Sequence, residues 1–474
     1  MRLFLYWNLI QLPGLGAGVT LYAALFCLCT FVYLRAGGHR QTKASLLSLL
    51  GIILSTLVFL LFDNPLIKVL NFMFLSATVI YWISAATGRT LEKRISVYIL
   101  GDLWQQVLLV PFGNFSSCFG TLKSLPAGNK KGKTVIAGAL GILIMIPVLA
   151  AVIHLLIAAD AAFAQVVNRL NFTVSTDTIF QIIMGIPVAC YLYGLVYGNH
   201  YGRKTGQVTV ETVDKMASVC RFAPGVAVYS ALTALNLVFI VYFLSQLTYL
   251  FSAFNNRLPE LMTYAEYARR GFFELCAVAA INLAVIALAQ LVVKRERVKV
   301  LRMETTALCL FTLMLIMTAL SKMVMYINTY GLTQLRVYTT WFMLVLFLIF
   351  AVTAVRQFKT FNAARVMVAA FMILFLALSY GNVDGRIAAY NIDRYEKGTL
   401  EDLDVQALAG LSDAAVPPMY ELYQHTADPN LKAKLKAAII KTNEGEAEPL
   451  ITPHETFRDF NLQHHSAQAI REKL

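Results

Sequence analysis

Charged residues are scarce in this sequence. Asp, Glu, Lys and Arg make up 14% of its 474 residues, hydrophobic residues make up 58%, and the mean hydropathy is +0.63. Because a soluble domain carries about 25% charged residues, this chain has too few polar side chains to cover a surface in water. The same composition excludes intrinsic disorder, collagen and coiled coils. It predicts an integral membrane protein.

The sequence is also poor in groups that bind metals or form disulfides. Its seven cysteines lie in or beside apolar segments, and none lies in the polar C-terminal tail. Cys27 and Cys29 are two residues apart, so they point to different sides of a helix and form a poor chelating pair. No Cys-x-x-Cys or Cys/His ligand spacing occurs. We therefore expect the cysteines to be small hydrophobic residues that face the membrane or pack inside the protein. We expect no disulfide framework, no metal and no cofactor.

Catalytic motifs are missing as well. Neither Gly-x-Ser-x-Gly nor His-Glu-x-x-His occurs, and the segment GNKKGKT at 128–134 is one residue short of a P-loop and follows no strand. His154 lies alone inside an apolar run; it is either an intramembrane functional group or, as we expect without a nearby carboxylate, a neutral packed histidine. The sequence leaves enzymatic activity uncertain and favours its absence.

The sequence consists largely of long apolar runs, which indicate membrane spans. A membrane span requires roughly 20 apolar residues in a helix, and the runs do not alternate with period two, which excludes a barrel. We predict an all-α, polytopic transmembrane helix bundle with about ten spans and no cleaved signal peptide. The spans are placed at 14–34, 44–62, 65–86, 134–158, 177–198, 224–252, 272–293, 305–326, 337–355 and 366–381.

The charges of the connecting loops alternate along the chain. Loops after odd-numbered spans hold 22 basic residues, whereas loops after even-numbered spans hold seven before the tail. By the positive-inside rule, the basic loops are cytoplasmic, and the N-terminus and C-terminal tail lie outside a bacterial cytoplasmic membrane. The formal net charge of +13 therefore reflects topology, and we expect no nucleic-acid partner.

The longest inner loop contains an apolar stretch at 95–110. Asp102, Gln105 and Gln106 interrupt it, which predicts a cytoplasmic helix lying in the interface with Trp104 at headgroup depth. The basic residues Lys130, Lys131 and Lys133 follow, and they are suited to anionic lipid.

The composition changes near residue 383. The last 92 residues contain ten basic and fifteen acidic side chains, so we place the transmembrane bundle at 1–382 and a soluble helical tail at 383–474. Short helices are expected at 400–411, 414–425 and 431–441, and an amphipathic stretch at 457–474 is expected to dock onto them. The paired residues His464 and His465 are expected to be exposed to solvent.

Polar residues gather where three segments reach the outer leaflet. On a helix, Glu266 and Arg270 are four residues apart and can pair. The segments form either one polar pocket near the outer interface or an ordinary aromatic and ionic belt that anchors helix ends. The candidate outer cluster consists of Glu266, Arg269, Arg270, Glu274, Lys322, Tyr326, Arg336, Asp393 and Arg394.

The same segments carry a family resemblance. The strings YAEYARRGFFEL, YINTYGLTQLRVYTTWFM and IAAYNIDRYEKGTLEDLDVQALAGLSDAAVPPMYEL, with the closing FRDFNLQHHSAQAIREKL, resemble the bacterial membrane family of domain of unknown function 4173. The sister family 4153 is the alternative. The resemblance implies a multi-helix bacterial membrane protein with a short helical tail and implies no activity. Such proteins often carry further helices upstream, which leaves the placement of Met1 open.

Three functional classes follow from these observations. The favoured one is a non-enzymatic envelope scaffold or sensor whose outer tail engages an envelope protein. The second is a transporter or lipid-handling protein, for which His154, Pro147, Pro187, Asn236, Asn282 and Gln290 are the polar or helix-breaking candidates. The third is a membrane enzyme that uses Glu266 with Arg270, or Lys322 with Asp393, at the outer interface.

Overall fold

The computed structural model describes residues 15–124, 176–254, 272–294, 298–440 and 457–474, with isolated positions between 141 and 157. Within these residues the structure is all-α apart from one isolated bridge between Ala223 and Val293. Eight of its helices are long and apolar enough to cross a membrane. The chain is therefore a multi-pass membrane protein, as its composition predicts.

These eight helices coincide with eight of the ten predicted spans. The span predicted at 177–198 is helical, as α10 (Thr176–Tyr201), although α10 is not among the eight. Of the span predicted at 134–158 only the isolated positions between 141 and 157 are described; His154 and the basic residues at 130–133 lie outside the described residues.

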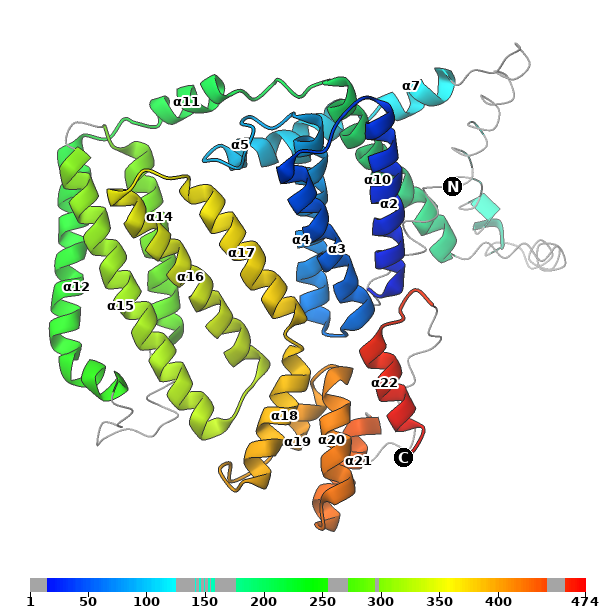
Figure 1. Ribbon diagram of the computed structural model, residues 1–474, viewed down its shortest axis with the longest axis vertical. Coiled ribbons are helices and arrows are strands. Elements are labelled where there is room, and N and C mark those ends of the chain that lie inside the picture. Colours follow the sequence, from blue (N-terminus) through cyan, green and yellow to red (C-terminus); the bar gives the residue numbers. More distant parts are fainter. Residues whose placement is uncertain are drawn as a thin grey trace.

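The helices run between two faces of the molecule (Figure 1). One face, which we call the C-terminal face, carries the helices that follow residue 382. The other, which we call the opposite face, carries the short helices α5 (Ile99–Trp104), α7 (Ser117–Ser124) and α11 (Val210–Val219). The described parts of the connections after α2 (Ala17–Ala36), α10, α14 (Phe272–Val292) and α16 (Gln334–Phe358) all lie on the opposite face. These connections belong to the loops with the predicted excess of basic residues.

A first bundle contains α10 with α2 (Ala17–Ala36), α3 (Lys43–Leu61) and α4 (Pro65–Thr87). Thr42 and Ser45 form a capping box at the start of α3, and Asn64 caps α4 immediately before a proline at its first position. Between α3 and α4, the Ser55 hydroxyl donates to Asn71 Oδ1 at 2.8 Å, and Asn71 Nδ2 donates to the Ser55 carbonyl at 2.7 Å. Because lipid offers such groups no partner, this reciprocal pair fixes the two helices against each other.

A broken helix follows α4 on the opposite face, as α5 (Ile99–Trp104), a π-helical turn (Gln105–Leu109) and α6 (Val110–Gly113). Its polar residues point into the protein: Gln105 Oε1 accepts from the Val208 N–H at 2.9 Å, and Gln106 Oε1 accepts from Asn199 Nδ2 at 2.8 Å. Trp104 is 58% exposed. This amphipathic arrangement suits the predicted interfacial position, which stays a prediction.

The broken helix packs against α10 at Gly194 and Gly198. A Cβ atom at Gly194 would lie 2.5 Å from the carbonyl oxygen of Pro111, so only glycine permits this approach. Small residues four apart allow helices in membranes to meet backbone to backbone. The spacing Gly194-Leu-Val-Tyr-Gly198 therefore positions α6.

A second bundle contains α12 (Gly225–Phe254), α14 (Phe272–Val292), α15 (Val298–Tyr330) and α16 (Gln334–Phe358). It has its own apolar core, which includes Leu308 and Phe350 and is separate from the core of the first bundle. Helix α17 (Ala363–Tyr380) joins the two, because it packs along α16 and also reaches α3, where the Tyr380 hydroxyl donates to the Leu54 carbonyl at 2.6 Å. Membrane helices therefore form two packed groups around α17 (Figure 1).

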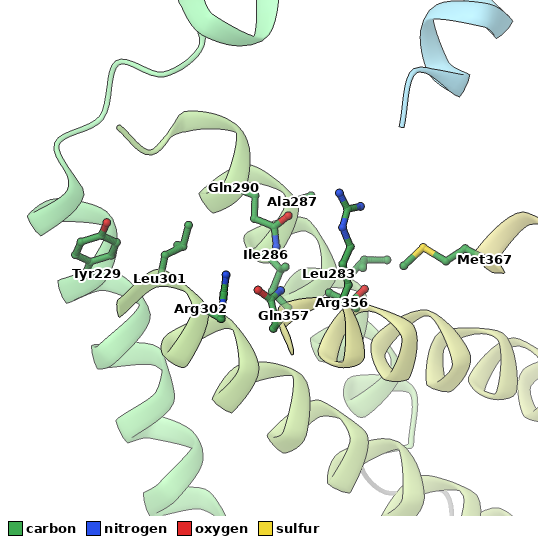
Figure 2. A pocket seen from close by; sticks show the side chains of 11 residues that line it. Tyr229, Leu283, Ile286, Ala287, Gln290, Leu301, Arg302, Arg356, Gln357 and Met367 are labelled. Carbon is green, nitrogen blue, oxygen red and sulfur yellow. The ribbon is translucent and has the colours of Figure 1, made fainter. Parts of the chain in front are cut away.

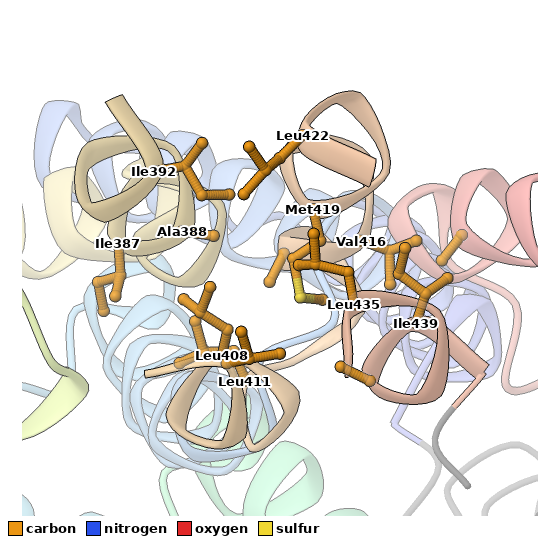
Figure 3. Close-up of a cluster of buried hydrophobic side chains, with 14 of the residues drawn as sticks. Ile387, Ala388, Ile392, Leu408, Leu411, Val416, Met419, Leu422, Leu435 and Ile439 are labelled. Carbon is orange, nitrogen blue, oxygen red and sulfur yellow. The ribbon is translucent and has the colours of Figure 1, made fainter. Parts of the chain in front are cut away.

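The chain after α17 forms a cluster of short helices on the C-terminal face. They are α18 (Val383–Glu396), α19 (Val405–Ala409), a 3-10 turn (Asp413–Ala415), α20 (Val416–His425), α21 (Pro429–Ile440) and α22 (Leu462–Arg471). Figure 3 shows their side chains converging on one apolar core, in which Ala388, Leu408, Met419 and Leu435 meet. The same core includes Val58, Ile67 and Leu378 at the ends of α3, α4 and α17. The C-terminal helices thus share a core with the first bundle and α17.

Candidate functional site

The structure describes six of the nine residues of the predicted outer cluster. Glu266, Arg269 and Arg270 lie outside the described residues, and with them the predicted pair of Glu266 and Arg270. The other six divide into two sets, which have different surroundings.

Tyr326, Arg336 and Arg394 meet at the C-terminal end of α15. The Arg336 guanidinium lies 4.0 Å from the centre of the Tyr326 ring, and Nη1 donates to the carbonyl of Tyr330 at 2.9 Å. Arg394 Nη1 donates to the carbonyl of Ile327 at 3.2 Å. The last carbonyls of a helix lack partners inside it, and cations stabilise that end of its dipole. These arginines therefore cap α15.

Asp393, Glu274 and Lys322 belong to different surroundings. The Asp393 carboxylate pairs with Lys397, four residues along α18, at 2.7 Å, and both side chains are more than half exposed. Glu274 is exposed at the start of α14, and Lys322 is half-buried on α15. These three side chains therefore belong to three different helices, and the single pocket stays a prediction.

A buried carboxylate that the predicted cluster does not include lies where the C-terminal helices meet the membrane helices. Asp384, in the first turn of α18, is 1% exposed. Gln334 Nε2 donates to its Oδ1 at 2.8 Å, while Asn64 Nδ2 and the Ser412 N–H donate to its Oδ2 at 2.8 and 3.0 Å. Asn64 also donates to the Tyr338 hydroxyl at 2.8 Å. One side chain thus ties together α4, α16, α18 and the turn before α20.

A second group of polar residues holds α22. We call it the C-terminal clamp; it consists of Asp63, Lys68, Asp413, Asn461, His464 and Arg471. Arg471 Nη2 donates to Asp413 Oδ1 at 2.6 Å, and His464 Nδ1 contacts Asp413 Oδ2. Asn461 Nδ2 donates to Asp63 Oδ1 at 2.9 Å, and Lys68 Nζ lies 3.1 Å from the same atom. The clamp therefore joins α22 to the turn between α3 and α4 and to the turn before α20.

Three groups of this clamp have the geometry of metal ligands. One ligand atom each from Asp63, Asp413 and His464 lies within 4.8 Å of the other two. However, each carboxylate already forms an ion pair with a basic side chain. Lys68 pairs with Asp63, and Arg471 donates to both oxygens of Asp413. Because these cations compensate the two negative charges, we assign the group to ion pairing rather than to a metal.

The expectation for His464 was wrong. The imidazole is partly buried and contacts Asp413, because Asn461 caps α22 and turns that helix onto the membrane helices. Asp63 and Asn461 are separated by 398 residues, so no local pattern relates them. The sequence feature that could have indicated this contact is the polar turn Asp63-Asn64-Pro65, which lies between two apolar spans on the predicted outer side.

Asp102 in the broken helix is a buried carboxyl on the opposite face. It accepts from the Leu91 N–H at 2.7 Å. Burial raises the pKa of Asp102, the Leu91 N–H opposes that rise, and Glu92 adds to it.

We expect Asp102→Asn to reduce the pH dependence of stability in mildly acidic solution. A pKa that is higher in the folded chain than in the unfolded chain means that the folded protein binds the proton more tightly, so stability falls as pH rises through this range. Asn keeps the acceptor for Leu91 and has no charge to bury. Thermal midpoints of both proteins against pH check this. Asp214→Asn, at an exposed aspartate on the same face, should keep the wild-type slope; identical slopes for Asp102→Asn and wild type would contradict the assignment.

Polar residues inside the membrane helices bond to one another. Asn236 Nδ2 donates to Glu304 Oε2 at 2.7 Å, and Asn282 Nδ2 donates to the Thr312 hydroxyl at 2.8 Å. Pro187 lies inside α10, and the helix continues through it. Such bonds hold neighbouring membrane helices together. Asn236 and Asn282 therefore have a packing role in the structure.

Comparison with known proteins places this chain in a family. The family model described as domain of unknown function DUF4153 matches residues 49–422. Neither the curated proteins nor the solved structures contain a match. The match supports the alternative that the sequence left open, the sister family 4153, and does not support family 4173. The closing string from Phe457 lies beyond the matched residues. The chain belongs to the DUF4153 family.

Proposed function

We propose that this protein is a non-enzymatic membrane scaffold or sensor that presents its C-terminal helices to an envelope partner. The observation that supports this is the attachment of those helices. Asp384 and the C-terminal clamp link them to the membrane helices by buried polar contacts. A set of short helices held in this way has a fixed orientation relative to the membrane, which is what a scaffold or sensor requires.

The surface that we assign to the partner is acidic. Glu396, Glu401, Asp402 and Asp404 are exposed at the end of α18 and in the segment that leads to α19. Asp404 caps α19, whereas the other three have no comparable structural bond among described residues. A partner that offers Lys or Arg side chains would complement this surface electrostatically.

We further propose that the C-terminal face lies outside the cytoplasmic membrane. The argument is the excess of basic residues in the loops of the opposite face. To test it, Cys118 in α7 and Cys220 after α11, the described native cysteines on that face outside the long helices, are first replaced by serine. Gln424→Cys on α20 should then react with a membrane-impermeant thiol reagent on intact cells, and Lys215→Cys on α11 only after lysis. The reverse pattern would overturn the orientation.

The scaffold proposal is tested by photocrosslinking in intact cells. A photoreactive amino acid at Asp402 should give one discrete adduct, and the same amino acid at Lys215 should not give it. Glu396→Gln with Glu401→Gln should reduce the adduct, whereas Glu421→Gln, which removes an exposed charge on α20, should leave it unchanged. Absence of any discrete adduct at Glu396, Glu401 and Asp402 would contradict the proposal.

Lipid handling is the second candidate, and a different observation favours it. A cavity of about 370 Å³ lies at the opposite face in the second bundle, and Gln290, one of the polar candidates identified in the sequence, lines it. The membrane-enzyme class has less support, since Tyr326, Arg336 and Arg394 cap a helix and Asp393 pairs within α18.

A further inference from the structure

The cavity in the second bundle is built at the ends of five helices. Its lining residues include Tyr229 near the start of α12, Gln290 near the end of α14, Arg302 near the start of α15, Arg356 near the end of α16 and Met367 near the start of α17. All five lie within about two helical turns of a helix end, or within roughly 10 Å along the axis. In helices that cross a bilayer, this depth is the level of the lipid headgroups.

The polar part of the lining is cationic. Figure 2 shows the side chains of Arg302 and Arg356 extending in the same direction, with Gln290 and Gln357 between them in this view. Among the lining residues that the structure describes, none is a carboxylate. Glu304, two residues after Arg302, instead accepts from Asn236 Nδ2 at 2.7 Å and from the Thr233 hydroxyl at 2.9 Å on α12. Among the described residues, the two guanidinium groups therefore face the cavity without a compensating anion.

Apart from Tyr229 and Thr353, the remaining lining is apolar and belongs to the membrane helices. Leu283 and Ile286 on α14, Leu301 on α15 and Met367 on α17 supply it. A volume of about 370 Å³ falls in the range of small-molecule sites, about 300–1,000 Å³. The cavity thus combines two cations and two side-chain amides near the helix ends with an apolar wall that extends deeper, to Leu283.

We propose that this cavity binds the phosphate headgroup of an anionic phospholipid from the leaflet at the opposite face. Guanidinium groups bind phosphate through paired N–H bonds, and the two amides offer further donors to its oxygens or to a glycerol hydroxyl. The apolar wall fits an acyl chain and has no role for a soluble anion. This inference is independent of the proposed scaffold, because it concerns the other face and other helices. It deepens the lipid-handling candidate, which rests on the same cavity.

The test compares two double variants that remove the same charge. Arg302→Gln with Arg356→Gln alters the cavity, whereas Lys299→Gln with Lys359→Gln removes two exposed lysines from the same helices and face without touching the lining. Each full-length protein is placed in nanodiscs of phosphatidylcholine with increasing phosphatidylglycerol, and bound lipid is counted by native mass spectrometry. We expect the arginine variant to lose preference for phosphatidylglycerol by about tenfold and the lysine variant to keep it.

Further arms separate the possible outcomes. Arg302→Lys with Arg356→Lys keeps the charge and should retain an intermediate preference for phosphatidylglycerol. This variant replaces the glutamine variant in the test if the glutamine variant does not fold. Glycerol phosphate added to phosphatidylcholine nanodiscs should not compete. An equal loss in the lysine and arginine double variants, competition by glycerol phosphate, or no phosphatidylglycerol preference in the wild type would each overturn the proposal.

Discussion

Replacing Asp384 with alanine should destabilise the protein by roughly 3–5 kcal/mol, because several buried donors lose their acceptor at once. Gln334 Nε2, Asn64 Nδ2 and the Ser412 N–H all donate to this carboxylate. Water does not readily replace it, since Asp384 is 1% exposed and Asn64 is 5% exposed. The loss should appear as a lower thermal midpoint in nanodiscs and as faster hydrogen exchange around Ser412.

Asp384→Asn should be much milder, at about 1 kcal/mol. All three donors to Asp384 are neutral, so the site requires acceptor atoms rather than a charge pair. An asparagine can keep its oxygen toward Asn64 and Ser412 and turn its amide toward Gln334, whose own amide can rotate to accept. The control is Asp393→Ala on the same helix, where an exposed pair should contribute less than about 1 kcal/mol. If asparagine proved as damaging as alanine, the negative charge itself would have a role that this arrangement does not provide.

The second large effect is expected at Asp413. Asp413→Ala removes the carboxylate that binds both terminal nitrogens of Arg471 and contacts His464. Asp413 is 2% exposed. Breaking a buried pair costs roughly 3–5 kcal/mol, because the remaining charge stays uncompensated; Arg471 is partly exposed, so we expect about 2–4 kcal/mol here. Hydrogen exchange of α22 should accelerate, since Arg471 and His464 both belong to that helix.

Two comparisons make the Asp413 prediction specific. Glu472→Ala, at an exposed position immediately after Arg471, should leave the exchange of α22 unchanged. In a double-mutant cycle, Asp413→Ala and Arg471→Met should show strong coupling, because each change removes the same interaction. Additive effects of the two changes, or normal exchange of α22 in Asp413→Ala, would show that the clamp does not hold the helix.

Both effects concern residues outside the predicted polar cluster. That cluster was chosen from polar residues that border apolar spans, and such residues usually cap helix ends or anchor them at the interface. Arg336 and Arg394 do so at the end of α15. Asp384 and Asp413 are distinguished instead by burial. Burial arises when α20 and α22 fold back onto α18 and onto the turn at Asp63, and a linear pattern of polarity does not reveal it.

The sequence by itself determined the all-α class, the positions of eight described membrane helices and the grouping of the basic loops, because each depends on local apolar length and on charge. Only the tertiary structure decided that the helices form two bundles joined by α17. It also decided that Asp384 collects donors from three elements and that Arg302 and Arg356 share a cavity. In lipid every span is apolar on most sides, so hydrophobicity does not distinguish a helix-facing surface from a lipid-facing one. Which surface of a span faces another helix depends on steric fit, as at Gly194. It also depends on the few polar side chains that hydrogen-bond to partners far away in the sequence.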